Sequence, residues 1–315
     1  MKLRQLAAGC GIVWAAAGFL FTPAGAAEEV SLAQQRLLAA ESAMEQGHSE
    51  DAVRIYSSIL ANDPGNAELL AKRGEAYYEI GRMDMAEADL RGALESAPDV
   101  MHPNYYMGLV KIRQGELSVA KEYLDRALAL SKESLERSAV QEALGQAALY
   151  GQDYERAIEC FTESINGKEN YPAYSHRASA RMKTGDYAGA EEDLTRLTEL
   201  YPNAPEPYHQ RGICRGSSGK YHAALEDFTK AIGMDPENPS LYSDRGYTYA
   251  CKGDLEAAVE DYTKALELDP KYSFAYSNRA AAYEKLGKKD LAKQDRELLE
   301  ILMEFEESGE QSKGR

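Results

Sequence analysis

Cysteine, histidine and basic residues are all scarce in this sequence, and each shortage argues against a class of function. The 315 residues include four cysteines and five histidines, and no group of them has the spacing of metal ligands. Lysine and arginine number 36 against 52 acidic residues, which gives a formal net charge of −16. Nucleic-acid binding draws most of its affinity from Lys and Arg, so this deficit argues against a phosphate-backbone ligand. The remaining composition is that of a soluble protein with a continuous core.

The first thirty residues differ from the rest of the chain. Lys2 and Arg4 form a short basic start, the uncharged apolar run Leu6–Phe21 follows, and small residues occupy positions 24–26. The run is shorter than the roughly 20 residues that cross a bilayer as a helix. We expect residues 1–26 to be a signal peptide, cleaved after Ala26 or Ala27, and the mature chain to be periplasmic or secreted. The alternative is an uncleaved membrane anchor that leaves the chain facing outward.

Export would place the chain in an oxidising compartment, where cysteines can pair. Three cysteines follow the predicted leader, Cys160, Cys214 and Cys251, and an odd number leaves at least one thiol free. We interpret all three as small apolar residues packed between helices.

A block of sequence recurs every 34 residues. Tyr-x-x-Arg followed by Ala or Gly begins at Tyr174, Tyr208, Tyr242 and Tyr276, and each block is followed by a Gly and, five residues later, an Ala. Repetition at such a period is the signature of stacked supersecondary units. Within each unit, Gly or Ala at position 8 predicts a close crossing of two helices, and Gly near position 15 ends the first of them.

This pattern resembles the tetratricopeptide repeat family over nearly the whole mature chain. The resemblance implies an all-α fold, a right-handed α-solenoid of about eight helix-turn-helix repeats, spanning residues 27–306. The predicted repeats are 33–66, 67–100, 101–134, 138–170, 171–204, 205–238, 239–272 and 273–306. Residues 135–137 are interpreted as an insertion and residues 307–315 as a loose polar tail.

Positions 7 and 23 of the repeat are either both charged or both non-ionic. Five repeats combine Arg with Asp, and the other three carry neither charge. A partly buried charge without its partner is costly, so joint presence or joint loss predicts a direct ion pair between the two helices. The predicted pairs are Arg73–Asp89, Arg177–Asp193, Arg211–Asp227, Arg245–Asp261 and Arg279–Asp295. The alternative is that these arginines bind an acidic ligand.

The family resemblance implies that the first helix of each repeat lines a concave groove that holds peptides or partner proteins. On a helix with 100° per residue, positions 2, 6, 9 and 13 point away from the packed face, with 5 and 12 beside them. Repeat three is the densest in aromatic and apolar residues at these positions, and two histidines occupy groove positions in adjacent repeats. The candidate partner-binding residues are Tyr78, His102, Tyr105, Tyr106, Leu109, Ile112, Tyr150, His176, His209 and Tyr247. The alternative to a binding role is that neighbouring helices or a tight superhelical turn cover these residues.

Acidic residues also gather on this arc in the first two repeats. Either a basic partner segment or a merely solvated acidic surface accounts for them. Some relatives bind acidic chaperone termini through a clamp of lysines and asparagines. The corresponding positions here are Leu37, Glu41, Lys72, His102 and Tyr106, so the clamp is absent.

No nucleophile, base and metal set is visible that would form an active site. The segment 216–220 has a phosphate-loop composition but the wrong spacing, and is interpreted as a turn. We expect a non-enzymatic protein-protein interaction scaffold that binds a protein or extended peptide, without nucleic acid, metal or small-molecule cofactor. A membrane is involved only if the first segment stays uncleaved, and the alternative function is then a membrane-anchored assembly factor.

Overall fold

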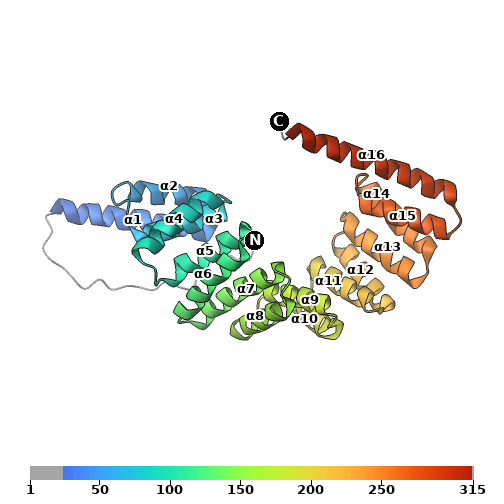
Figure 1. The fold of residues 1–315 in the computed structure, drawn as a ribbon, viewed down its shortest axis with the longest axis horizontal. Coiled ribbons are helices and arrows are strands. Elements are labelled where there is room, and N and C mark those ends of the chain that lie inside the picture. The colour runs from blue at the N-terminus through green and yellow to red at the C-terminus, as the bar shows by residue number, and fades with distance from the viewer. Residues whose placement is uncertain (1–23, 314–315) are drawn as a thin grey trace. The chain divides into compact units, whose positions relative to one another are not determined.

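The computed structural model describes residues 24–313, with side chains described from 32 to 304. This part of the chain contains sixteen helices and no strand (Figure 1). The predicted signal peptide lies mostly outside the described residues, because the first helix begins at Ala24.

The chain divides into two units, Met1–Ala173 and Tyr174–Arg315. The helices of the first unit are α1 (Ala24–Gln46), α2 (Ser49–Leu60), α3 (Ala67–Glu79), α4 (Met83–Ser96), α5 (Met101–Arg113), α6 (Leu117–Leu130), α7 (Ser134–Tyr150) and α8 (Tyr154–Gly167). The division falls within α9 (Tyr171–Thr184). The second unit continues with α10 (Tyr187–Leu200), α11 (Pro205–Ser217), α12 (Tyr221–Met234), α13 (Pro239–Lys252), α14 (Leu255–Leu268), α15 (Ser273–Lys285) and α16 (Lys289–Lys313).

Helix hairpins build both units. Each odd-numbered helix, called here a first helix, is followed by an even-numbered second helix, and the two pack together in pairs such as α3 with α4 and α13 with α14. First helices also contact the next first helix along the chain, as α3 does α5 and α13 does α15. This arrangement confirms the predicted all-α solenoid of helix-turn-helix repeats.

Small residues permit the close crossing within each hairpin. A Cβ added at Gly145 of α7 would lie 2.6 Å from the ring of Phe161 in α8, and one at Gly108 of α5 would lie 2.5 Å from Leu124 Cγ in α6. Real Cβ atoms do not approach neighbours this closely in well-packed interiors. The predicted role of repeat position 8 is therefore confirmed.

The fourth hairpin makes its turn differently from the others. The turn residue with positive φ is a glycine in seven hairpins, for example Gly219 with φ +78°. Between α7 and α8 it is Gln152, with φ +61°. Side chains with a Cβ disfavour this left-handed conformation, so Gln152 holds a strained backbone.

Two segments differ from their predicted structure. Residues 135–137 were expected to form an insertion outside the repeats, but they lie in the first turn of α7. Its start is held by the Glu136 carboxylate, which accepts hydrogen bonds from the backbone N–H groups of Lys132 (2.8 Å) and Glu133 (3.2 Å). The tail expected to be loose is also helical, because α16 continues through it to Lys313.

Candidate partner-binding face

Five ion pairs join the first and second helices of their hairpins, and all five are the predicted ones. In each, one guanidinium donates two hydrogen bonds to a single Asp carboxylate, and the shortest N···O distances are 2.6 or 2.7 Å. The pairs are Arg73–Asp89, Arg177–Asp193, Arg211–Asp227, Arg245–Asp261 and Arg279–Asp295. All five Asp side chains are buried. The guanidinium groups of these arginines are therefore engaged within the fold. They are not available to bind an acidic ligand, which was the alternative interpretation.

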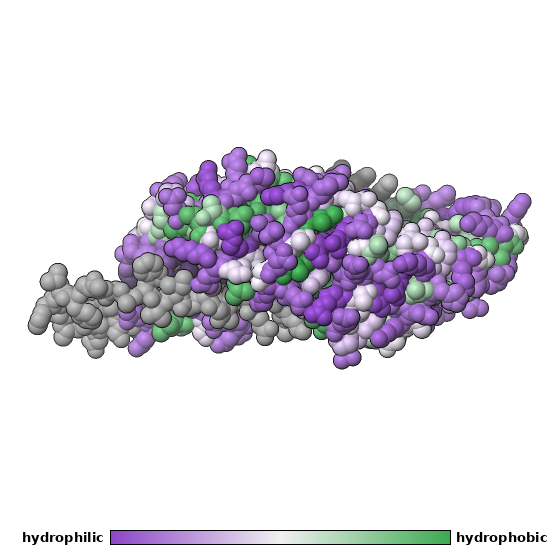
Figure 2. Space-filling view, turned by 90° about the horizontal axis from the view of Figure 1, so that it is seen from below, coloured by the Kyte–Doolittle hydropathy of each residue, from purple (hydrophilic) through white to green (hydrophobic). Residues whose placement is uncertain are grey.

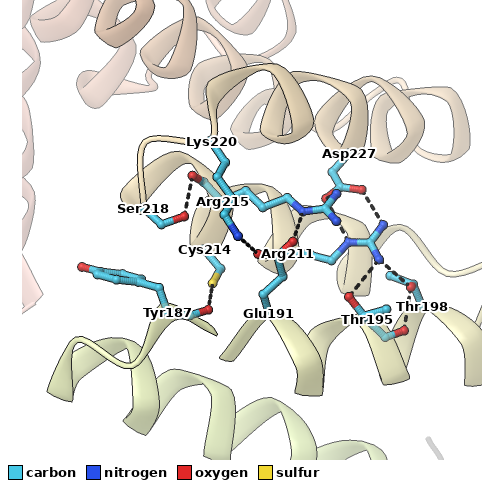
Figure 3. Close-up of polar contacts among 10 residues, drawn as sticks. All are labelled: Tyr187, Glu191, Thr195, Thr198, Arg211, Cys214, Arg215, Ser218, Lys220 and Asp227. Carbon is cyan, nitrogen blue, oxygen red and sulfur yellow. Dashed lines mark hydrogen bonds and ion pairs between the residues drawn. The ribbon is translucent and has the colours of Figure 1, made fainter. Parts of the chain in front are cut away.

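Four of these arginines also reach back to the preceding hairpin. Nη1 of Arg211 donates to the hydroxyls of Thr195 (3.2 Å) and Thr198 (3.0 Å) in α10 (Figure 3). A hydroxyl sixteen residues before the arginine accepts in the same way from the other three, in the pairs Arg73–Ser57, Arg245–Thr229 and Arg279–Thr263. One guanidinium thus ties together three helices from two hairpins.

A second arginine extends the network around Asp227. Arg215 donates to Asp227 (2.7 Å) and to Glu191 (2.8 Å) of α10, and Lys220 also pairs with Glu191 at 2.6 Å (Figure 3). The hydrogen bond from Lys220, together with Arg215, lowers the pKa of Glu191 against the opposing effect of burial. Of the segment 216–220, predicted as a turn, residues 216 and 217 still belong to α11 and the turn follows at 218–219. Its lysine, Lys220, pairs with the Glu191 carboxylate.

All three cysteines after the predicted leader are free thiols. Cys160 and Cys214 are buried, as predicted, and burial raises the pKa of Cys214 to about 11. For Cys251 the prediction of a packed residue is wrong, because it is exposed near the end of α13. Cys251 stands at repeat position 13, which the helical pattern marks as outward-facing. This position could have predicted its exposure.

Polar contacts also join successive first helices on the side that carries repeat positions 2, 5, 6, 9 and 13, called here the first-helix face. Lys72 of α3 pairs with Glu41 of α1. Ser175 of α9 donates to Gln210 of α11 at 2.9 Å. His209 of α11 lies 2.6 Å from Asp244 of α13. These contacts fix neighbouring first helices in register within each unit.

His209, a predicted groove residue, belongs to this set of contacts. Its Nε2 lies 2.6 Å from Asp244 and its Nδ1 lies 3.8 Å from Glu206. Burial lowers the pKa of His209, but the hydrogen bond with Asp244 and the charges of Asp244 and Glu206 outweigh burial and raise it to about 9. His209 is therefore a cation held between two carboxylates at neutral pH. His176 is half-buried on α9, and burial lowers its pKa.

The predicted residues of repeats two and three form an aromatic cluster, defined as Tyr78 on α3 and His102, Tyr105 and Tyr106 on α5. Tyr106 lies at the centre, with ring-centroid distances of 4.8 Å to His102, 5.2 Å to Tyr105 and 5.8 Å to Tyr78. Contacts of this geometry between aromatic rings are favourable. The structure thus brings together four of the ten candidates.

The Glu75 carboxylate contacts polar atoms of two residues in the aromatic cluster. Glu75 of α3 accepts from the Tyr106 hydroxyl at 2.7 Å and contacts His102 Nε2 at 2.8 Å. Burial alone would raise the pKa of Glu75, but the hydrogen bonds from His102 and Tyr106 and the charge of Lys72 outweigh it and lower the pKa. Burial and Glu75 raise the pKa of Tyr106 well above its usual value. The Tyr106 hydroxyl and the His102 Nε2 are therefore engaged by Glu75 within the fold.

Ile112 was predicted on the exposed side of α5, and this is wrong. It is buried in a core with Ala120, Val140 and Leu144, and Leu109 is partly buried against the same core. The physical reason is that α5 has first helices on both sides, α3 and α7, so position 12 faces α7. A helical wheel describes one helix and does not show which side a neighbouring helix will cover.

Tyr150 and Tyr247 are the predicted groove residues that are most exposed, at 64% and 53%. The structure adds Phe274 at position 2 of α15, 52% exposed. It stands 27 residues after Tyr247, the same separation that brings His102 into contact with Glu75. Tyr247 and Phe274 therefore occupy neighbouring positions on α13 and α15. The 34-residue repeat places Phe274 at position 2, so its exposure could have been predicted from the sequence. It was missed because only tyrosines and the repeat densest in aromatic residues were considered.

The sequence also gave no indication of Glu142, a buried carboxyl at position 5 of α7. Its Oε1 accepts a hydrogen bond from the Gln146 side chain, at 3.3 Å. Burial raises the pKa of Glu142 to about 7, with Gln146 opposing the shift. This carboxyl contributes to the electrostatic surroundings of Tyr105, whose pKa is raised by burial and by Glu142.

The surface seen in Figure 2 is largely hydrophilic, with apolar areas interrupted by polar side chains. In the part of the chain that the structure describes, no three His, Cys, Asp or Glu side chains are placed to hold a metal ion. Within the same part of the chain, none of the helices is both long enough and apolar enough to cross a membrane.

Comparison with known proteins matches the chain to models of the tetratricopeptide repeat at residues 37–100, 105–175, 171–204 and 205–238, and to a TPR repeat model at 248–287. A similar solved structure is a tetratricopeptide repeat protein from Parabacteroides merdae, with 18% identity and a TM-score of 0.57 over 86% of this chain and 98% of that one.

Two related sequences are longer proteins. The tetratricopeptide repeat and J domain-containing co-chaperone DNJ1 of Fusarium oxysporum f. sp. lycopersici is 25% identical over 63% of this chain and 40% of its own length. The small glutamine-rich tetratricopeptide repeat-containing protein 2 of Saccharomyces cerevisiae is 28% identical over 56% of this chain and 47% of its own length. The chain therefore spans less than half the length of either relative.

Proposed function

The chain belongs to the tetratricopeptide repeat family, and on that premise we propose that it is a non-enzymatic scaffold that holds a protein or an extended peptide on its first-helix face. Proteins of this family act as protein-interaction scaffolds. The proposal adds the face and the residues that make the contact.

One observation carries this proposal: two large aromatic side chains, Tyr247 and Phe274, are about half exposed at neighbouring positions on α13 and α15. Exposed aromatic groups on a rigid surface are typical anchors of protein interfaces, because they bury a large area at little entropic cost. The surrounding framework is rigid, since Arg245 and Arg279 tie these two helices to α14 and α16. The pair therefore offers a preformed contact area.

The aromatic cluster of the first unit has a different role in the proposal. Its His102 Nε2 and its Tyr106 hydroxyl contact Glu75, so the cluster supports the face by joining α5 to α3. Glu45, Glu68 and Glu79 are exposed on the same side of α1 and α3. We propose that a partner segment that binds these first helices of the first unit is basic, since complementary charge speeds and orients binding.

Export to the cell envelope is part of the proposal and rests on residues 1–26 alone. The basic start, the apolar run and the small residues before Ala27 support it. Mass spectrometry of the mature protein tests it. An amino terminus at Ala27 or Glu28 supports a cleaved signal peptide, whereas an intact amino terminus in the membrane fraction supports the alternative of an anchored assembly factor.

The face is tested by capturing partners with tagged protein from the envelope or secreted fraction. The test variant is Tyr247→Ala, Phe274→Ala, and the matched control is Met85→Ala, which removes an exposed apolar side chain from the second helix α4. A partner retained by wild type and control but lost by the test variant supports the proposal. A partner retained by all three proteins places the contact elsewhere and rejects it.

A further inference from the structure

Repeat three differs from the later repeats at position 4. Repeats five to eight carry a tyrosine there, in the order Tyr174, Tyr208, Tyr242 and Tyr276, whereas repeat three carries Asn104. The Tyr208 hydroxyl donates a hydrogen bond to the carbonyl of Pro202, six residues before it, at 3.3 Å. Asn104 replaces this contact, because its Nδ2 donates to the carbonyl of Pro98, also six residues before it, at 2.9 Å. Repeat three therefore keeps the hydrogen bond but lacks the aromatic ring.

A cavity of about 190 Å³ adjoins Asn104. Three residues of α4 line it, Arg91, Leu94 and Glu95, and two of α6, Tyr123 and Arg126. Pro98 and Asn104 complete the lining. Asn104 is buried and forms the base, whereas the arginines, Glu95 and Pro98 are exposed and form the mouth. Cavities of about 150 Å³ accept a benzene ring, so this one has room for a single aromatic ring.

The base of the cavity contains a hydrogen-bond acceptor without a donor. Asn104 is 1% exposed, and among the residues that the structure describes no donor reaches its Oδ1. The amide orientation is fixed, because Nδ2 donates to the carbonyls of both Pro98 and Val100, at 2.9 and 2.8 Å. A buried acceptor that is left unpaired is unfavourable. A hydroxyl group that enters the cavity would supply the missing donor.

The mouth of the cavity carries two cations. Arg91 and Arg126 are exposed, and neither forms an ion pair with another residue of the described part of the chain. Arg126 stands at repeat position 26, with its guanidinium 5.7 Å from the centroid of the Tyr123 ring. In repeat six the cation at the same position, Lys230, lies 4.2 Å from the centroid of the Tyr208 ring. The later repeat thus shows a tyrosine ring covered by the position-26 cation, which is a favourable contact.

We propose that this cavity binds a tyrosine side chain of a partner polypeptide. The ring enters hydroxyl first, the hydroxyl donates to Asn104 Oδ1, and Arg126 covers the face of the ring. The cavity holds one ring, so the rest of the ligand lies at the mouth, where Arg91 and Glu95 offer a donor and an acceptor to a peptide backbone. The inference is independent of the first-helix face, because the cavity lies between the second helices α4 and α6. Met85, the control position for that face, does not line it.

The first test adds N-acetyl-tyrosinamide, a single tyrosine between two amide groups, to the full chain and measures binding by saturation-transfer NMR. We expect saturable binding with a dissociation constant on the order of 1 mM, as suits a ligand of this size. N-acetyl-phenylalaninamide lacks the hydroxyl and should bind at least about fivefold more weakly, because Asn104 Oδ1 would stay buried without a donor. The absence of saturable binding to wild type, or equal affinities of the two ligands, overturns the inference.

Variants of the lining locate the bound ring. Asn104→Tyr fills the cavity with the ring that repeats five to eight carry, and should abolish binding without lowering the melting temperature. Arg126→Ala should weaken binding about two- to fivefold through loss of the cation. Arg137→Ala, which removes an exposed arginine of α7 outside the lining, is the control and should bind as wild type does. Undiminished binding by Asn104→Tyr or by Arg126→Ala, or a lowered melting temperature of Asn104→Tyr, overturns the inference.

The polypeptide source of the tyrosine is tested by selecting displayed random peptides that bind wild type but not Asn104→Tyr. The selected peptides are expected to share a tyrosine, and its replacement by alanine to abolish their binding. Selected peptides without a tyrosine, or no enrichment on wild type, contradict a polypeptide ligand at this cavity.

Discussion

At the scale of single residues, the Arg–Asp pairs are the feature that the sequence predicts most completely. Their joint presence or absence among repeats inside one chain was enough to identify them, because burial makes an unpaired member costly. The same reasoning could not find Glu75 or Glu142, whose surroundings are made by a neighbouring first helix. Contacts within a hairpin repeat with the period, whereas contacts on the face vary from repeat to repeat.

Removal of Arg245 is expected to cost about 3 to 5 kcal/mol, because Asp261 would be left buried without its guanidinium. The double variant Arg245→Ala, Asp261→Ala should lose less than the single one. Arg211→Ala should also lose less, because Arg215 still pairs with Asp227. Urea unfolding of the variants measures these differences, and strictly additive losses in the Arg245 and Asp261 cycle would refute the pairing energy.

His209 makes a pH-dependent contribution. Its folded pKa of about 9 lies above the usual 6.5, so the protonated form stabilises the fold. This contribution is full below about pH 6.5 and is lost as pH rises through 9. Wild type should therefore exceed His209→Gln in stability by up to about 3 kcal/mol near pH 6, with the difference fading by pH 9 to 10. A difference that does not change between pH 6 and 10 would contradict the ion pairing with Asp244.

At the scale of helices and turns, the 34-residue period predicts where most hairpins lie. The reason is that most turns require a glycine and the close helix crossings require a small residue at a fixed repeat position. The departures have local causes. α7 begins earlier than the repeat count suggests because Glu136 caps its first turn. α16 extends through the predicted loose tail, where no repeat position constrains the sequence. Ile112 is buried because α5 has neighbours on two sides.

The turn between α7 and α8 gives a prediction at this scale. Gln152→Gly should stabilise the protein by about 1 kcal/mol, since glycine adopts positive φ without the cost that a Cβ imposes. Gly219→Gln is the matched reverse change, because a Cβ at Gly219 meets no atom within 4 Å and only the backbone conformation is strained. It should lose a similar amount. Equal melting temperatures of wild type and Gln152→Gly would show that the turn is unstrained.

At the scale of the whole molecule, function lies in the residues that the repeat does not fix. The framework arginines, glycines and core aromatics recur in most hairpins, where they are engaged within the fold. What differs between repeats is the first-helix face, with its acidic residues on α1 and α3 and its exposed Tyr247 and Phe274. The sequence predicts which side of the first helices forms the face, but only some of the side chains that are exposed on it. Exposure depends on how neighbouring helices pack.

Binding to a basic partner segment should weaken with salt if the acidic end of the face takes part. Surface charges are screened within about 8 Å at physiological ionic strength. Glu45→Gln, Glu68→Gln, Glu79→Gln should reduce both the association rate and its salt dependence, as measured by stopped-flow mixing with the captured partner. Wild-type binding that is insensitive to salt would remove this end of the face from the proposal.

Site-specific photo-crosslinking in the producing cells tests whether the first-helix face holds the partner. A photoreactive phenylalanine analogue is placed at position 247 on α13 or, as the control, at position 85 on α4. We expect a crosslinked protein or peptide from position 247 and none from position 85. Crosslinks from position 85 alone, reproducible and to a single partner, would contradict it by placing the contact on the second helices.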